Sequence, residues 1–277
     1  MSDILQDLST PALINAIEAN VFDFWLLLHH WPQAELHDDP DLLWSITDIP
    51  FPLFNSVLRA KLAPDGVDAA LEAVIARYKR RNVPALWWTG PATTPADLGV
   101  YLEAHGFTHQ GDVPGMAVDL QSLNENIPIP PHFTIEKVSD IATMKKWRHV
   151  FSVGFGMPDF ATDAFIDLCE RVSLGEQLPL YHYIGWLKGE PVASSSVCLG
   201  AGVAGIYNVA TVPEARRQGI GALITLAALR EARMMGYRVG TLHSSSMGFN
   251  AYRRLGFQEH CTIGHYVWSP EHEQGAS

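Results

Sequence analysis

Apolar residues recur along the chain with two spacings, one typical of helices and one typical of strands. Steps of three and four positions predict helices over residues 1–30, 65–81, 97–104, 141–155, 162–172 and 219–235, with another helix holding Asn250–Phe257. Shorter apolar runs predict strands at 85–89, 116–120, 132–138, 180–187, 191–199, 203–212 and 238–243, and strand-like runs between 42 and 62. Helices interleaved with short strands predict an α/β (α+β) fold.

The order of these elements is repeated. A helix, a short strand, a helix ending in Gly-Phe and a final strand occupy residues 65–120 and again residues 219–268. Between the two copies, residues 124–131 contain three prolines and are typical of a linker. We therefore expect two domains, 1–126 and 132–277, the first a degenerate copy of the second. Convergence of two unrelated α/β segments remains the alternative.

One stretch has the composition of an anion-binding loop. The strand at 203–212 is broken by Pro213, and Arg216-x-x-Gly219-x-Gly221 then leads into the helix over 219–235. The first amides of a helix lack internal partners and carry the positive end of its dipole, so phosphate oxygens bind there. Gly236 is expected to end the helix in a left-handed conformation.

Three other interpretations of this loop are possible from its residues. A dinucleotide-binding loop needs G-x-G-x-x-G, but Ile224 stands at the third glycine. A Walker loop needs Gly-Lys-Ser/Thr, which is absent here. A tight turn before a core helix is the structural alternative.

The loop resembles the acetyl-CoA pyrophosphate-binding motif of the GNAT (GCN5-related N-acetyltransferase) family. Downstream, Tyr252-x-x-x-Gly256-Phe257 is similar to the closing segment of that family. The resemblance covers residues 132–268. It implies a GNAT-like mixed, mostly antiparallel twisted sheet flanked by helices, here expected in tandem with the first half.

The resemblance also implies roles for individual residues. The backbone edge that pairs with pantetheine is expected at Val209, Ala210 and Thr211. The pyrophosphate is expected at Arg216, Arg217, Gln218, Gly219, Ile220, Gly221 and Ala222. Tyr252 matches the family tyrosine that protonates the departing thiolate, with packing against the core as its structural alternative.

The base and the acceptor site are less well defined. Relatives often carry a glutamate on the strand before the loop, but residues 205–211 contain no carboxylate. We expect a water relay, with His243 as a titratable candidate. Tyr207 and Asn208 are candidate acceptor-site residues, although strand alternation would let only one of them face it. Ser245 stands where many relatives carry an asparagine, and the serines at 244–246 are expected to cap the Tyr252 helix.

Composition narrows the partners. The net charge of −11 lies in the first half, where residues 1–130 hold 17 Asp and Glu against 6 Lys and Arg. This excess argues against a nucleic acid partner and favours a cationic amine. Three widely spaced cysteines suggest neither a disulfide framework nor a metal site. No apolar run of about 18 residues and no basic leader are present, so we expect no membrane partner and a cytoplasmic location. A homodimer is left open.

These observations predict an acetyl-CoA-dependent N-acetyltransferase that transfers acetyl directly to the amine of a small molecule. A non-catalytic acyl-CoA-binding regulatory module is one alternative. An acyltransferase for a longer acyl group or an alcohol is another. We expect one coenzyme A per chain, because Asp65 and Asp68 stand where the first half would need phosphate-binding donors.

Overall fold

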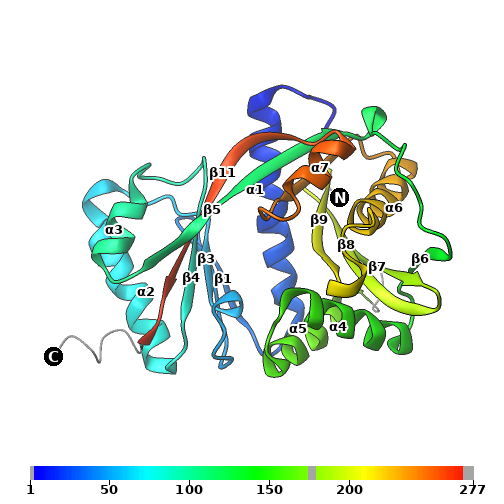
Figure 1. Cartoon of the computed structure of the whole chain (residues 1–277). Coiled ribbons are helices and arrows are strands. Elements are labelled where there is room, and N and C mark those ends of the chain that lie inside the picture. Colours follow the sequence, from blue (N-terminus) through cyan, green and yellow to red (C-terminus); the bar gives the residue numbers. More distant parts are fainter. Residues whose placement is uncertain (1–2, 174–178, 271–277) are drawn as a thin grey trace. The chain divides into compact units, whose positions relative to one another are not determined.

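The computed structural model describes residues 3–173 and 179–270 (Figure 1). The chain forms two compact units. Unit 1 consists of Met1–Phe24 and Pro114–His260, and unit 2 of Trp25–Val113 and Cys261–Ser277. Each unit has its own apolar core. The expected combination of helices with a mostly antiparallel sheet is confirmed.

Unit 1 is built on a sheet with the strand order β5-β10-β9-β8-β7-β6. The strands are β5 (Thr108–Asp119), β6 (Phe133–Lys137), β7 (Leu180–Leu187), β8 (Glu190–Gly200), β9 (Val203–Thr211) and β10 (Val239–His243). All neighbours are antiparallel except β9 and β10, which are parallel. The helices are α4 (Ile141–Phe155), α5 (Asp159–Ser173), α6 (Ile220–Met234) and α7 (Phe249–Leu255). Except for β5, which begins eight residues before the strand expected at 116–120, these bounds lie within about three residues of the expected elements.

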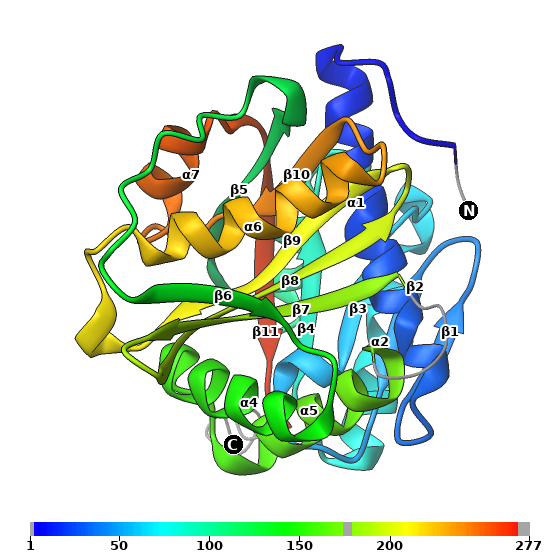
Figure 2. The ribbon, with the colours of Figure 1, turned by 90° about the vertical axis from the view of Figure 1, so that its right-hand side faces the viewer.

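Helices α4 and α6 cover opposite faces of this sheet. The Ser195 hydroxyl on β8 donates to the Ile224 carbonyl of α6. The next residue, Ser196, contacts His182, whose ring packs against Trp147 of α4. Successive strand residues point to opposite faces, so the two helices enclose the strands. Figure 2 shows α6 lying across the strands on its side.

The ends of the long helices have clear causes. Asp140 caps α4, because its Oδ1 accepts from the Thr143 amide at 2.8 Å. Gly236 follows α6 with φ +96°, and the Tyr237 amide donates back to the Ala232 carbonyl at 3.1 Å. The expected left-handed end of this helix is confirmed.

Unit 2 contains a smaller sheet with the order β1-β2-β3-β4-β11. Its strands are β1 (Glu35–Asp38), β2 (Leu43–Ile46), β3 (Ser56–Leu58), β4 (Ala85–Thr89) and the end of β11 (Gln258–Trp268). Only β3 and β4 are parallel, and α2 (Val67–Arg81) connects them. Helix α3 (Leu98–Ala104) follows β4. The parallel pair and its connecting helix repeat the arrangement of β9, α6 and β10.

The predicted repeat of element order is therefore confirmed, since α2-β4-α3-β5 and α6-β10-α7-β11 follow each other in the same sequence. The final strand of each copy does not close its own copy. In unit 1, β10 pairs with residues 115–119 of β5, and in unit 2, β4 pairs with residues 264–268 of β11. Each copy thus provides the closing strand for the other.

This exchange makes the compact units differ from the sequence division at 126–132. The end of β5 belongs to unit 1, and the end of β11 belongs to unit 2. Residues 1–24 also join unit 1, where Asn20 of α1 (Thr10–Leu26) donates to the Cys198 and Gly200 carbonyls of β8. Proline content identified the linker but carried no information about strand pairing.

One stretch of helix, Thr10–His30, is long and apolar enough to cross a membrane by length and composition alone, and half of it is buried inside the protein. Its Asn20 side chain is fully buried and hydrogen bonded in unit 1. This is the expected behaviour of a core helix, because a buried amide needs polar partners.

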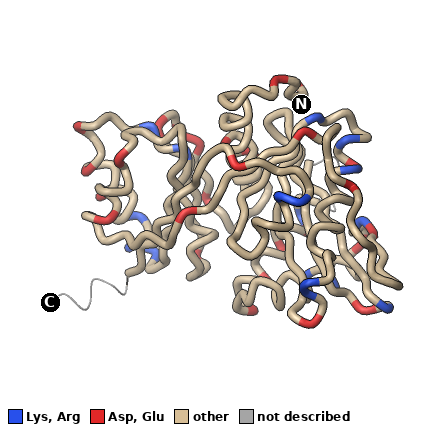
Figure 3. Tube along the Cα trace, turned by 45° about the horizontal axis from the view of Figure 1, so that its top comes forward, with Lys and Arg blue, Asp and Glu red and all other residues tan. Residues whose placement is uncertain are grey.

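Charged residues are spread over the whole trace (Figure 3). Residues 25–113 contain 11 Asp and Glu and 6 Lys and Arg. Several of these form ion pairs within unit 2, including Arg59 with Asp38 and Arg81 with Glu35 and Asp48. Because acidic residues outnumber basic ones, residues 25–113 keep a net negative charge after these pairs form.

Two imidazoles should make the protein sensitive to acid. Burial lowers the pKa of His182 to about 3 and that of His265 to about 4, from an ordinary 6.5. Below pH 6.5 the unfolded chain therefore binds protons that the folded chain excludes, and stability falls as the pH falls. Each histidine should cost about 2 kcal/mol of unfolding free energy between pH 7 and pH 5.

Nuclear magnetic resonance of the imidazole nitrogens measures this directly. Both rings should stay in the neutral, singly protonated form down to pH 5. A titration of either ring near pH 6.5 in folded protein would contradict the expectation.

Candidate functional site

The start of α6 carries unpaired backbone amides. Gly219 precedes the helix with φ +79°, and no side chain caps this end. Arg217, also left-handed at φ +62°, and Gln218 are exposed beside it. The amides of Ile220, Gly221 and Ala222 lie in the first turn, where no intrahelical acceptor is available. This end of the helix fits an anionic group.

Arg216 organises the loop before the helix. Its Nε donates to the Thr211 carbonyl at 3.0 Å, and its Nη2 donates to the Gly154 carbonyl at 3.2 Å. The side chain therefore ties the end of β9 to the end of α4. Its remaining N–H groups add positive charge near the helix start.

Beside the loop, β9 separates from β10. The parallel pairing ends at Ile206 opposite Leu242, although β9 continues to Thr211. On the other side, Ala210 and Thr211 remain paired with β8. The edge of Val209, Ala210 and Thr211 that faces away from β8 therefore has no strand partner in the β9–β10 register.

A β-bulge interrupts β9 at this point. Ser196 faces Tyr207, whereas Ser194 faces Ala210, so Asn208 and Val209 together oppose one residue of β8. Asn208 has φ +55°, a left-handed conformation. The bulge breaks the simple alternation that the sequence suggested for Tyr207 and Asn208.

Tyr207 and Asn208 consequently have different neighbours. Tyr207 stacks on Phe24 at 4.2 Å between ring centroids, and its hydroxyl donates to Asn20 Oδ1 at 2.7 Å. Burial raises the pKa of this phenol. The Asn208 amide donates to the Ser196 hydroxyl at 3.0 Å. Both side chains are thus held by polar contacts within unit 1.

Tyr252 lies on α7 and is 9% exposed. Its ring meets Phe257 edge-on at 5.9 Å, and Gly248 lies so close that a side chain at 248 would clash with it. Burial raises the pKa of Tyr252 above its ordinary value, so the phenol is protonated at neutral pH. His243 is half-buried at the end of β10, where β10 pairs with Gly115.

The expected serine cap of this helix needs correction. The cap position of α7 is Gly248, and no side chain caps it. The Ser245 hydroxyl instead accepts from the Gly248 amide at 3.2 Å, and the Ser245 carbonyl accepts from Phe249. The serines therefore form the turn that precedes the helix, which starts later than the sequence suggested.

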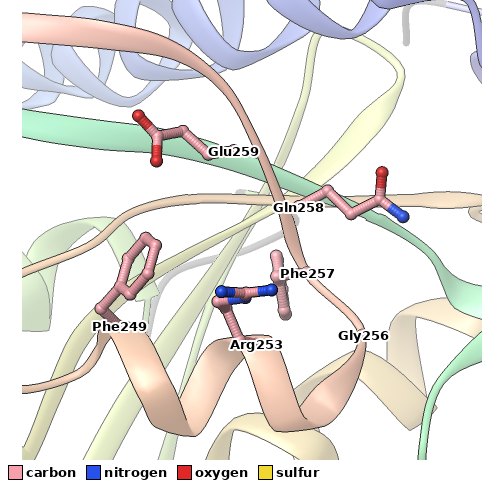
Figure 4. Close-up of a pocket in the computed structure, with 6 residues that line it drawn as sticks. All are labelled: Phe249, Arg253, Gly256, Phe257, Gln258 and Glu259. Carbon is pink, nitrogen blue, oxygen red and sulfur yellow. The ribbon is translucent and has the colours of Figure 1, made fainter.

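A pocket lies along α7 and the start of β11 (Figure 4). Its lining consists of Phe249, Arg253, Gly256, Phe257, Gln258 and Glu259. Neither Tyr252 nor the first turn of α6 contributes to this lining. We therefore place it outside the candidate site.

The corresponding region of unit 2 is closed by the chain itself. After β4 the backbone returns to the continuation of β3, where the Thr94 amide donates to the Ala60 carbonyl and the Leu62 amide donates to the Thr94 carbonyl, both at 2.9 Å. Helix α2 begins at Val67, with Asp65 just before it and Asp68 in its first turn. In unit 2 the strand edge that stays open in unit 1 is thus paired, and carboxylates stand at the helix start where unit 1 has arginines.

Among residues 3–173 and 179–270, no group of three His, Cys, Asp or Glu side chains could hold a metal ion. Cys169, Cys198 and Cys261 form no disulfide with one another.

Comparison with known proteins agrees with this geometry. Residues 179–259 match the model of the acetyltransferase (GNAT) domain. No match was found among curated protein sequences. A GCN5-related N-acetyltransferase from Kribbella flavida has a similar structure, with a TM-score of 0.70, 20% identity and coverage of 90% of this chain and 95% of that chain.

Two further structures extend the likeness over almost the whole chain. A GCN5-related N-acetyltransferase from Sphaerobacter thermophilus gives a TM-score of 0.63 at 15% identity and covers 98% of this chain and 95% of its own. A tandem GNAT protein from the clavulanic acid biosynthesis pathway gives 0.58 at 13% identity and covers 96% of each chain.

The fold is therefore a tandem GNAT fold, and the resemblance to the GNAT family is confirmed, with the matched acetyltransferase domain in unit 1. The domain match and the fold support assignment as an acyltransferase. The individual site residues remain predictions that the geometry makes specific.

Some residues around the site had no signal in the sequence. Asn20 and Phe24 contact Tyr207 from a segment almost 190 positions earlier, and His182 and Ser196 reach Asn208 across strands. Each looks like an ordinary member of a helix or strand, and only the register of three strands brings the last three together.

Proposed function

We propose that this protein transfers the acetyl group of acetyl-CoA to the amine of a small molecule by direct transfer. One observation carries the proposal: the uncapped start of α6 follows the segment of β9 that continues to Thr211 without β10 as a partner. An anion-binding helix end and an open strand edge together fit a ligand with a pyrophosphate and an amide-containing arm. The tandem fold and the acetyltransferase domain support the proposal.

In this proposal some residues of unit 1 bind the cofactor and others transfer protons. The amides of residues 220–222 and the charge of Arg217 hold the pyrophosphate, while Val209–Thr211 pair with the pantetheine arm. Bound acetyl-CoA would supply the thioester. Tyr252 donates its phenolic proton to the sulfur as the carbon–sulfur bond breaks, and burial keeps that proton in place until then.

The amine needs to lose a proton. Strand β9 has no carboxylate between Gly205 and Thr211, so we assign this step to water, with His243 as the candidate imidazole. The acidic excess of the first half favours a cationic acceptor. We place the protein in the cytoplasm.

The first prediction concerns Gly221. A Cβ there would meet Thr211 Oγ1 at 3.6 Å, an ordinary contact, so Gly221→Ala should bind coenzyme A almost as the original protein does. Gly221→Leu should crowd the amides of the first turn and weaken binding at least about tenfold, or about 1.4 kcal/mol. Titration calorimetry on both folded variants measures the difference. Equal affinity of the two variants for coenzyme A would show that the pyrophosphate does not bind at this helix end.

A second prediction concerns Tyr252. Tyr252→Phe keeps the ring against Phe257 but removes the proton, so kcat should fall by about 10²–10⁴ while the KM for acetyl-CoA stays nearly constant. Steady-state kinetics over a panel of amines, beside thermal melting, measures this.

A purely packing role for Tyr252 would lower the melting temperature and leave kcat unchanged. Binding of coenzyme A without turnover of any amine by the original protein would favour a regulatory module. Preference for longer acyl chains or for alcohols over amines would favour the other alternative.

A third prediction is that each chain binds one coenzyme A. The edge of Ala60–Leu62 in unit 2 is already paired with Thr94, and α2 starts among carboxylates. Calorimetric titration of the full chain should saturate at one equivalent, and Gly221→Leu should move that single transition to at least about tenfold higher coenzyme A concentration. Saturation at two equivalents would show a working site in unit 2.

A further inference from the structure

The bulge in β9 is held by side chains that have no part in the chemistry described above. Asn208 adopts φ +55°, a conformation that a residue other than glycine takes at a cost. Such a conformation persists only when surrounding contacts fix it. The contacts of Asn208 are therefore expected to fix its conformation.

A line of hydrogen bonds leads from the half-buried Asn208 to the buried His182 across two strands. Its Nδ2 donates to Ser196 Oγ on β8 at 3.0 Å, and Ser196 Oγ lies 2.7 Å from His182 Nδ1 on β7. The register pairs His182 directly with Ser196. Ser196 is fully buried and His182 is 1% exposed. Ser196 Oγ therefore accepts from Asn208 Nδ2 and is itself hydrogen bonded to the His182 ring, so the hydroxyl links the two side chains.

The backbone around the bulge is held as well. Ser194 Oγ donates to the Asn208 carbonyl at 3.0 Å, and Trp147 Nε1 donates to the Ser195 carbonyl at 3.3 Å. A bulge takes carbonyls out of the strand ladder, and buried carbonyls need partners. Side chains from β8 and α4 supply these partners.

A contribution to the stability of the fold does not by itself explain the histidine at position 182. Its Nε2 is buried and has no hydrogen-bond partner in the part of the chain that the structure describes. Burial also keeps the ring neutral, with its pKa lowered to about 3. A buried polar atom without a partner destabilises a fold. The imidazole is better explained by the Ser196 hydroxyl that it holds in place.

The place where this line ends is the open edge of β9. Pairing with β10 stops at Ile206, and Val209–Thr211 follow directly after Asn208. A change in the backbone angles of Asn208 would turn the amides and carbonyls that come after it. We propose that Ser196 and His182 are positioning residues that fix Asn208 in its left-handed conformation and thereby aim the Val209–Thr211 edge at the acyl-CoA. This rests on the proposed function.

Ser196→Ala tests the proposal. It leaves Asn208 without its acceptor, so part of the population should leave the left-handed conformation, and coenzyme A should bind about fivefold or more weakly. Ser195→Ala is the matched control, because Ser195 is equally buried on the same strand but bonds to Ile224 of α6. It should lose thermal stability to a similar extent and keep its affinity for coenzyme A.

Position 208 provides a rescue. Asn208→Ala loses the hydrogen bond and keeps the cost of the left-handed conformation, whereas glycine adopts that conformation freely. Asn208→Gly should therefore bind coenzyme A more tightly than Asn208→Ala. In the Asn208→Gly background, Ser196→Ala should cause little further loss. An undiminished effect of Ser196→Ala in that background would overturn the proposal, as would equal affinities of Ser196→Ala and Ser195→Ala.

A measurement without ligand separates this proposal from the proposed function. In nuclear magnetic resonance, the Asn208 side-chain amide should exchange slowly with solvent, and the Ser196→Ala variant should lose that protection while Ser195→Ala keeps it. Fast exchange in the original protein would overturn the positioning line even if coenzyme A binds. If this protection is present but the original protein does not bind coenzyme A at all, the proposed function fails, and with it the role of this line in aiming an acyl-CoA edge.

Discussion

The separation of β9 from β10 after Ile206 is the constraint on which the candidate site depends. A parallel pair normally satisfies the backbone groups of both strands, but here the pairing stops while β9 continues to Thr211. The bulge at Asn208 changes the direction of β9. Arg216 then donates to the carbonyls of Thr211, at the end of β9, and of Gly154, near the end of α4, and so connects the two elements. An open strand edge and an uncapped helix end are thus produced by neighbouring residues.

Unit 2 shows what happens to the same topology when that separation is filled. Its parallel strands and connecting helix repeat those of unit 1, but Thr94 pairs with the continuation of β3. Backbone groups that would be available to a ligand are satisfied internally, and Asp65 and Asp68 replace the arginines of the loop. The same topology therefore gives an open strand edge in one unit and a closed edge in the other. A loop of a few residues and the charge at one helix end make the difference.

Local sequence features predicted the parts of the structure that have local causes. Gly236 takes the predicted left-handed conformation, and apolar spacing located α4, β4 and β7 at their observed bounds. Long-range features had no such signal. The exchange of β5 and β11 depends on which edge each strand finds. The serines before α7 form a turn and not the predicted cap, because both structures use the same residue types. The line from His182 to Asn208 depends on the register of three strands.

The position of the polar residues also explains how the orientation of β9 is fixed at this site. Asn20 holds the Tyr207 hydroxyl, and Ser196 holds the Asn208 amide, so neighbouring residues of one strand are fixed by different elements. Gly205 is what allows the first of these contacts, because any side chain there would overlap Asn20. Positions 205 and 208 of the strand therefore contribute to directional hydrogen bonds and not to apolar packing. Such bonds define an orientation that apolar contacts leave loosely specified, and the orientation of β9 is what the open edge requires.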